Sequence, residues 1–269
     1  KSYNKFVSTL SYRNRGVAFV GANDGMLHAF KMGKNIPGRS VFVSQLADST
    51  DLNGNNPVAP TGLGNELWSY IPKHVLPYLK HRGNPSYKHM YFVDSTPTIT
   101  DASIGVITGV CSNNLLKGCS IDTDCGASPL TCTAVSPACT GSDCPKVDLS
   151  WRTVLIGSMG LGGATRNYGA TCTNCVKTPI TDNGYSSYFA LDVTDSSAPK
   201  LLWEFAHPRL GYSTVGPAIV RIKDSTETGA TQKNGKFYVV LASGPTGPVD
   251  TGLMQMKGYS DQSLALFVL

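Results

Sequence analysis

The decapeptide GANDGMLHAF at residues 21–30 closes one apolar run and opens another. The first run is VAFV at residues 17–20, and Asn23, Asp24 and Gly25 separate it from MLHAF. Asn, Asp and Gly tolerate the positive φ angles of a tight turn, and Asn and Asp side chains can bond the turn backbone. The stretch therefore predicts a β-hairpin with Asp24 and Gly25 in its turn.

The same order of segments recurs along the chain. In the first copy the hairpin is followed by ELWSY at 66–70. The second copy has the strand-like segments VLIGS at 154–158 and FALDV at 189–193, followed by LWEF at 202–205. The third copy runs from VVLASG at 239–244 to LALFVL at 264–269. Apolar segments led by proline, at 95–100 and 213–220, precede the second and third copies. Four short strands per repeat are typical of a β-propeller blade.

We therefore predict an all-β propeller domain over residues 1–269, with blade units near 15–94, 95–212 and 213–269; an ordinary β-sandwich is the alternative. Asp24, Gly25, Trp68 and Trp203 are the candidate residues that lock the blades. The chain starts in a polar stretch that leads into the first unit and ends inside the apolar run 264–269, so we expect a polypeptide truncated at both ends. One short helix is predicted, over residues 71–82, and the three histidines near it, His74, His81 and His89, are expected to be partly exposed.

Cysteine usage indicates an oxidising compartment. Six of the eight cysteines lie in a polar insertion at residues 110–150, and the other two form a CTNC sequence; the eight are Cys111, Cys119, Cys125, Cys132, Cys139, Cys144, Cys172 and Cys175. An even number in a loop too polar for its own core predicts disulfides, whose pairing stays open among 15 connectivities for the first six. Zinc is the rival, but those six include neither a CxxC pair nor a neighbouring histidine. The CTNC sequence precedes Val176 rather than a histidine, which argues against covalent haem.

Composition excludes several classes of function. The net charge is +5 and there is no run of Lys or Arg, so nucleic acid is not an expected partner. No apolar segment approaches the roughly 20 residues that span a bilayer, so no transmembrane segment is expected in this stretch. No GxSxG motif marks a hydrolase nucleophile, and Asp192 and Asp195 are expected to cap a turn.

Eight segments together resemble the C-terminal propeller of the PilC/PilY family of type IV pilus biogenesis proteins and tip adhesins. They are GANDGMLHAF (21–30), ELWSYIP (66–72), STPTITD (95–101), WRTVLIGSMGLGG (151–163), YFALDVTD (188–195), PKLLWEF (199–205), LGYSTVGPAIVRI (210–222) and GKFYVVLASG (235–244). The resemblance implies a modified, quinoprotein-like propeller, located outside the cell or on its surface, at the pilus tip or outer membrane. It implies support of pilus assembly, opposition to retraction and adhesion through propeller loops, with minor pilins or a tip complex and host or abiotic surfaces as partners.

The same family carries an EF-hand-type calcium loop, which the resemblance places beyond Leu269. Within the chain, Asp51, Asn53 and Asn55 offer oxygen ligands at alternate positions, but Gly62 stands where a bidentate acid belongs. These three residues are weak calcium candidates, and an Asx-rich turn is the alternative.

Two functions remain open as alternatives to the pilus assembly and adhesion that the resemblance implies. A quinone-dependent dehydrogenase uses similar tryptophan-bearing blades, but the chain has no vicinal Cys-Cys pair to cover a quinone, and we expect neither quinone nor haem and no enzymatic activity. An outer-membrane assembly scaffold built on similar blades is the third hypothesis.

Overall fold

The computed structural model describes residues 2–13, 15–32, 34–35, 46–47, 62–87, 89–105, 107–112, 114–119, 131–139, 150–166, 183–222, 236–247, 249–250, 255–256 and 260–269. Over these residues the protein is all-β with few helices, as predicted. None of the helices there combines the length and apolar character needed to cross a membrane.

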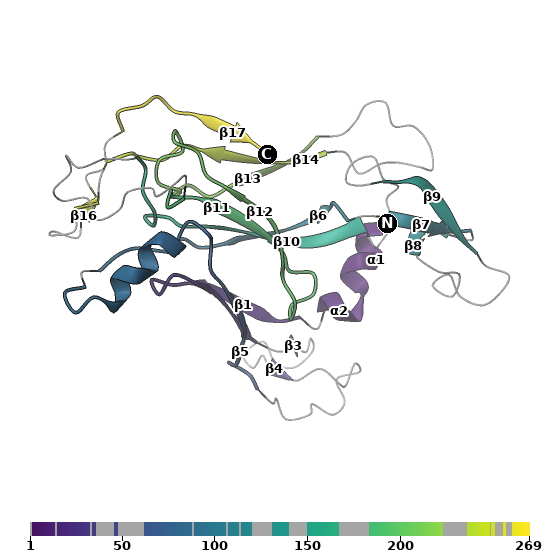
Figure 1. Cartoon of the computed structure of the whole chain (residues 1–269). Helices are drawn as coiled ribbons and strands as arrows, with labels where there is room; N and C mark the ends of the chain where they lie inside the picture. The colour runs from purple at the N-terminus through teal and green to yellow at the C-terminus, as the bar shows by residue number, and fades with distance from the viewer. Residues whose placement is uncertain are drawn as a thin grey trace.

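Three antiparallel sheets form the body of the molecule. The first sheet has the order β1-β2-β5, the second β12-β11-β10-β6 and the third β13-β14-β17. Figure 1 shows them as successive layers, with the third sheet at the top and the first at the bottom. Their strands are β1 (Val17–Gly21), β2 (Leu27–Lys31), β5 (Glu66–Tyr70), β6 (Thr98–Ser103), β10 (Trp151–Ser158), β11 (Tyr188–Asp192), β12 (Lys200–Phe205), β13 (Ala218–Ile222), β14 (Lys236–Ala242) and β17 (Leu266–Val268).

The hairpin predicted from residues 21–30 is confirmed. β1 and β2 pair from Val17 opposite Lys31 to Gly21 opposite Leu27. Gly25 in the turn has φ 105°, a region that L-residues rarely adopt, and the Met26 N–H donates to Asp24 Oδ1 at 2.9 Å. The local sequence therefore sets the strand register.

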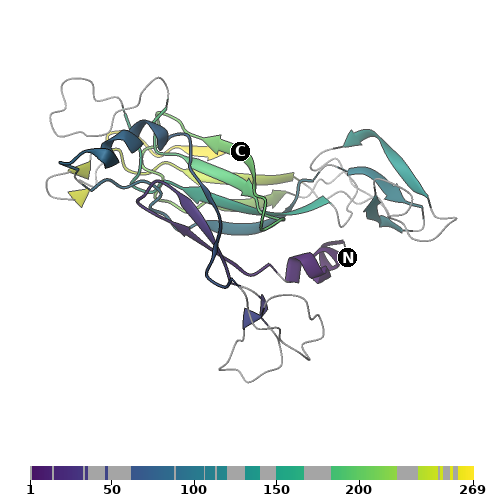
Figure 2. The ribbon, with the colours of Figure 1, turned by 60° about the horizontal axis from the view of Figure 1, so that its bottom comes forward.

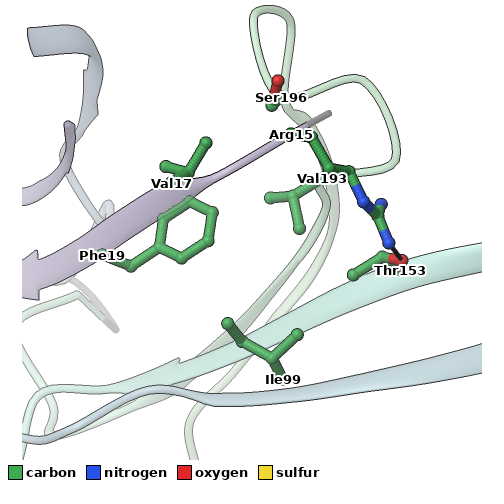
Figure 3. A pocket seen from close by; sticks show the side chains of 7 residues that line it. All are labelled: Arg15, Val17, Phe19, Ile99, Thr153, Val193 and Ser196. Carbon is green, nitrogen blue, oxygen red and sulfur yellow. Dashed lines mark hydrogen bonds between the residues drawn. The ribbon is translucent and has the colours of Figure 1, made fainter. Parts of the chain in front are cut away.

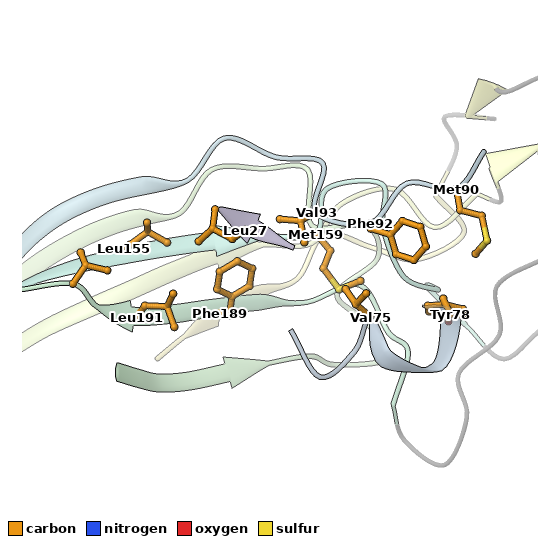
Figure 4. Close-up of a cluster of buried hydrophobic side chains, with 11 residues drawn as sticks. Leu27, Val75, Tyr78, Met90, Phe92, Val93, Leu155, Met159, Phe189 and Leu191 are labelled. Atoms are coloured by element: carbon orange, nitrogen blue, oxygen red, sulfur yellow. The ribbon is translucent and has the colours of Figure 1, made fainter. Parts of the chain in front are cut away.

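Each pair of neighbouring sheets encloses its own apolar cluster. The cluster between the first and second sheets includes Leu27, Leu155 and Phe189, together with side chains from the segment that follows β5 (Figure 4). The cluster between the second and third sheets includes Ile156 and Leu241. Neighbouring residues of β10 thus point into different clusters, so seven of the eight β10 residues are buried. The second sheet is covered on both faces.

The predicted number of helices is wrong. The described residues include α1 (Ser2–Ser8), α2 (Leu10–Arg13) and the 3₁₀ helix η1 (Leu76–Gly83), which overlaps the segment 71–82 predicted as a short helix. Pro77 has no N–H to donate to the carbonyl four residues earlier, whereas i to i+3 bonds such as Tyr78 N–H to Val75 C=O (2.9 Å) remain available. The prolines of this segment therefore favour the tighter helix.

Three small sheets lie beside the three main ones. The pairs β3 (Lys34–Asn35) with β4 (Leu46–Ala47) and β15 (Val249–Asp250) with β16 (Gln255–Met256) are short. The cysteine-bearing strands β7 (Ile107–Cys111), β8 (Asn114–Cys119) and β9 (Cys132–Cys139) form a sheet of order β8-β7-β9. Figure 2 shows this sheet projecting from one end of the stack.

Candidate functional site

The predicted ligand and disulfide residues are only partly within the described residues. Cys111 and Cys132 are disulfide-bonded, and the described part of the chain holds no free cysteine. Cys119 and Cys139 end β8 and β9. The calcium candidates and the remaining cysteines lie outside the described residues: Asp51, Asn53, Asn55, Cys125, Cys144, Cys172 and Cys175. Over the described ranges, no three His, Cys, Asp or Glu side chains are grouped so as to hold a metal ion.

A tryptophan and a second aromatic residue on β5 join the first sheet to the second. The Trp68 indole N–H donates to the Ser196 carbonyl at 2.8 Å, and its ring lies 5.6 Å from that of Phe19. Two residues further on, the Tyr70 ring lies 5.2 Å from the Phe189 ring of β11. Both side chains pack on the apolar cluster between the two sheets. We call this arrangement the aromatic step.

The aromatic step recurs between the second and third sheets. Trp203 and Phe205 of β12 have the same spacing and pack on the second apolar cluster. The Phe205 ring lies 5.2 Å from the ring of Phe267 in β17. Trp68 lies opposite Ala29 in the first sheet and Trp203 opposite Ala190 in the second. The two tryptophans singled out from the sequence therefore occupy equivalent places at two successive junctions.

Glu204 adds a polar link at the first junction. As the residue between Trp203 and Phe205 on a strand, it projects to the opposite face, toward the first sheet. Its carboxylate accepts a hydrogen bond from the Tyr70 hydroxyl and two from the Lys73 N–H, at 3.1 and 3.2 Å. Burial, followed by the hydrogen bond to Glu204, raises the pKa of Tyr70, so the phenol stays a donor.

A histidine held between two carboxylates lies on the first sheet. His28 Nε2 is 2.8 Å from Asp24 Oδ2 and its Nδ1 is 2.7 Å from Glu66 Oε1. Burial alone would lower the pKa of His28, but the hydrogen bonds and charges of Glu66 and Asp24 outweigh it and raise that pKa. The turn residue Asp24 thus bonds both its own turn and β2, and Glu66 connects β2 to β5.

His28 stands where the second sheet has Phe189. Each precedes the alanine that lies opposite the tryptophan of its sheet. Leu27 and Ala29 on either side of His28 are fully buried, so His28 projects from the other face of the first sheet, away from the second sheet. The face that carries aromatic contacts in the second sheet therefore carries a charged cluster in the first.

An arginine and an aspartate form a second polar network where α1 and α2 approach the second sheet. Arg15 Nη2 donates to Thr153 Oγ1 at 2.5 Å, and the Thr153 hydroxyl donates to Asp101 Oδ1. The hydroxyls of Tyr3 and Tyr12 donate to Asp101 Oδ2 at 2.9 and 2.8 Å. Burial and these bonds to Asp101 raise the pKa of both tyrosines.

Arg15 also lines a pocket of about 130 Å³ between β1 and the second sheet. Figure 3 shows side chains from β1, from β6, from β10 and from the segment after β11 around it. The lining residues besides Arg15 are Val17, Phe19, Ile99, Thr153, Val193 and Ser196. The pocket thus combines mostly apolar walls with one guanidinium group.

Two predictions about single residues have different outcomes. Asp192 and Asp195 cap a turn as expected, because their Oδ1 atoms accept from Thr194 N–H and Ser197 N–H, each at 2.9 Å. The predicted exposure of His74 is wrong, since its side chain is buried and its Nδ1 accepts from the Gly184 N–H at 3.2 Å. The Gly184 N–H is supplied by a segment 110 residues away, which a local pattern does not reveal.

Sequence reasoning missed His28, Glu204, Arg15 and Asp101. The aromatic step had a detectable signal, because Trp-x-Tyr at 68–70 and Trp-x-Phe at 203–205 share their spacing. Most contacts of the polar networks gave no such signal, since the partners are far apart in the chain, as with Tyr70 and Glu204, although Asp24 and His28 are only four residues apart.

These features define the class of the protein: it is an all-β protein whose antiparallel sheets are stacked face to face and joined by recurring aromatic steps. The chain is homologous to the PilY1 type IV pilus biogenesis factors, which confirms the resemblance inferred from its motifs. It is 28% identical over 249 residues to PilY1 of Pseudomonas aeruginosa, an alignment that covers 90% of this chain and 12% of that protein. A PilY1 homologue of Xylella fastidiosa is 26% identical over 260 residues, covering 90% of this chain and 11% of that protein.

The chain therefore spans about an eighth of the length of the curated relatives that it matches. The crystal structure of the Pseudomonas aeruginosa PilY1 C-terminal domain aligns with 99% of this chain and 30% of that one, at 24% identity and a TM-score of 0.45. No family model matches the chain.

Proposed function

We propose that the chain is part of an exported β-propeller that takes part in type IV pilus biogenesis by binding other molecules. The observation that carries this proposal is the 28% identity to PilY1, a type IV pilus biogenesis factor, over 90% of the chain. The disulfide-bonded state of Cys111 and Cys132 supports an oxidising location. We propose that the other six cysteines are disulfide-bonded as well.

The recurring aromatic step supports the propeller. Two successive junctions use the same contacts, with ring separations of 5.2 Å for Tyr70 and Phe189 and for Phe205 and Phe267. Radial repetition of short antiparallel sheets is how a propeller protects its strand edges. In this proposal the three sheets belong to the blade units near 15–94, 95–212 and 213–269 of one quinoprotein-like domain.

Binding is favoured over catalysis because the relatives are named as biogenesis factors and because the polar groups at the junctions are used within the fold. Glu204 accepts from Tyr70 and Lys73, and Asp101 accepts from three hydroxyls. We propose minor pilins or a tip complex as partners, with surface adhesion and opposition to retraction as consequences of tip location. Calcium would be held outside the described residues.

Two experiments test this function. In the bacterium that encodes the chain, deletion of its codons in frame from the gene is expected to remove surface pili while pilin levels stay normal, measured by shearing and immunoblot. The matched control is Arg209→Met, an exposed side chain, which is expected to leave piliation unchanged. Normal piliation after the deletion would contradict the proposal.

A binding assay then separates the alternatives. The purified chain is expected to capture minor pilins and to give no saturable absorbance change when titrated with pyrroloquinoline quinone. Quinone binding without pilin capture would favour the dehydrogenase, and capture of outer-membrane assembly proteins alone would favour the scaffold.

A further inference from the structure

The sheet β8-β7-β9 places two disulfide-bonded cysteines directly opposite each other. Cys111 ends β7, Cys132 begins β9, the two are partners in the strand register, and both are disulfide-bonded. The Ser112 N–H donates to the Thr131 carbonyl at 2.9 Å, so the next pair along is hydrogen-bonded. Because the two kinds of pair alternate in an antiparallel ladder, the cysteines form a non-hydrogen-bonded pair, with Cα atoms about 4.5 Å apart. This spacing lies within the range of about 4.4 to 6.8 Å that is usual for disulfides.

Polar groups fasten the same end of the sheet beside the disulfide. The Thr131 N–H donates to Ser112 Oγ at 3.1 Å, so the residues next to the two cysteines are bonded through a side chain as well as through the backbone. Cys111 is fully buried and Cys132 is half-buried. The register and the bonded state of both residues therefore join Cys111 to Cys132.

The middle strand of this sheet keeps two other cysteines apart. Cys119 of β8 lies opposite Gly109, and Cys139 of β9 lies opposite Ile107 on the other side of β7. Adjacent strands are about 4.8 Å apart, so two strand spacings, or about 9.6 Å, separate these cysteines at the least. Cα atoms more than about 7 Å apart cannot be bridged without movement of the backbone. The sheet therefore excludes a bond between Cys119 and Cys139.

The sheet β8-β7-β9 takes no part in the apolar packing of the main sheets. Among the described residues, neither of the two apolar clusters includes a member of β7, β8 or β9. Figure 2 shows this sheet projecting from one end of the stack. A small structure without a large core of its own depends on disulfides or similar cross-links for its stability. The sheet therefore needs its own covalent bonds to stay folded.

We propose that the sheet β8-β7-β9 is a separately unfolding unit that is fastened by a disulfide between Cys111 and Cys132. In this unit Cys119 and Cys139 each bond either Cys125 or Cys144. Four cysteines can pair in three ways, and the exclusion of a Cys119–Cys139 bond leaves two of them. The unit is independent of the proposed role in pilus biogenesis.

Disulfide mapping of the purified, unreduced chain tests the pairing. The chain is digested with pepsin at acid pH, where the thiolates that exchange disulfides are protonated, and linked peptides are sequenced by mass spectrometry. Peptides joined through Cys111 and Cys132 are expected, and none joined through Cys119 and Cys139. A bond from Cys111 to any other cysteine, or a bond between Cys119 and Cys139, would overturn the proposal.

Removal of the disulfide tests whether the unit unfolds separately. The double variant Cys111→Ser, Cys132→Ser leaves neither cysteine unpaired. Tryptic cleavage after Lys117 in β8 is expected to become about tenfold faster or more, because cleavage follows the population of the open form, which the disulfide limits. The melting transition of the main sheets is expected to change little. It is followed by the fluorescence of the three tryptophans, which all lie in β5, β10 and β12.

The matched control removes the other two cysteines in the same way. Cys172→Ser, Cys175→Ser is expected to leave cleavage after Lys117 at the rate of the unmodified chain. Cleavage that is unchanged in the Cys111→Ser, Cys132→Ser variant, or that the control accelerates equally, would contradict the proposed unit. Loss of the tryptophan transition in the Cys111→Ser, Cys132→Ser variant would also contradict it, because the main sheets would then depend on the same bond.

Discussion

Removing the hydroxyl of Tyr70 tests whether the first junction is held by a specific polar bond. Tyr70→Phe deletes the donor to Glu204, and Glu204→Gln keeps the shape of the acceptor but removes its charge. A hydrogen bond to a charged group contributes about 1.5 to 3 kcal/mol. Because both side chains are half-buried and water competes, we expect each variant to lower the free energy of unfolding by about 1 kcal/mol.

The pair is measured as a double-mutant cycle by urea denaturation at pH 7. The double variant is expected to lose less than the sum of the single losses, with a coupling energy of about 1 kcal/mol. Tyr12→Phe combined with Glu204→Gln is the control, because the Tyr12 hydroxyl bonds Asp101 in a separate network, and these two losses should add. A Tyr70–Glu204 coupling no larger than that of the control pair would refute the reasoning.

Four further predictions concern single positions. The pKa of His28 is raised above 6.5, so its stabilising contribution is complete below pH 6.5 and is lost as the pH rises through the folded pKa; His28→Gln should flatten that part of the stability–pH profile measured by urea denaturation. The pKa of His74 is lowered, first by burial and then by the Lys73 charge, so its contribution is present above pH 6.5 and is lost as the pH falls; His74→Asn should flatten the acid side instead. Gly25→Ala should cost roughly 1 to 3 kcal/mol in the same assay, because φ is 105° and the new Cβ would lie 3.0 Å from a Val75 methyl group. Leu266→Lys should leave the melting temperature nearly unchanged, because this side chain is 64% exposed.

The hairpin and the order of strands could be predicted because their causes are local. The Asn-Asp-Gly turn requires a positive φ at Gly25, and a glycine provides it wherever the turn is placed. Alternating apolar residues then place Leu27 and Ala29 on one face without any knowledge of the rest of the fold. Trp68 and Trp203 were visible for a similar reason, because each lies in a short segment that recurs.

The polar networks could not be predicted because their causes are tertiary. His28 meets Glu66 only after 38 residues have returned the chain to the same sheet, and Arg15 meets Thr153 after 138. The 3₁₀ geometry of η1 is an intermediate case. Pro77 was visible in the sequence, but whether it kinks an α-helix or favours a tighter one depends on how Val75 and Tyr78 pack against the first apolar cluster.

The two outer faces of the stack differ in chemistry. Ile219, Phe237 and Phe267 pack toward the second sheet. Most of the residues that alternate with them are also apolar, with Lys236 as an exception, and Leu266 and Val268 are 64% and 61% exposed. An antiparallel sheet that meets water on one face normally carries polar residues there. This face has instead the composition of the second sheet, whose strand β10 is covered on both sides. The outer face of the first sheet carries His28 between two carboxylates at the place where the second sheet has Phe189. The third sheet is therefore suited to pack against another apolar sheet, as a blade of the proposed propeller would, whereas the outer face of the first sheet carries a histidine whose pKa is raised by hydrogen bonds to Glu66 and Asp24.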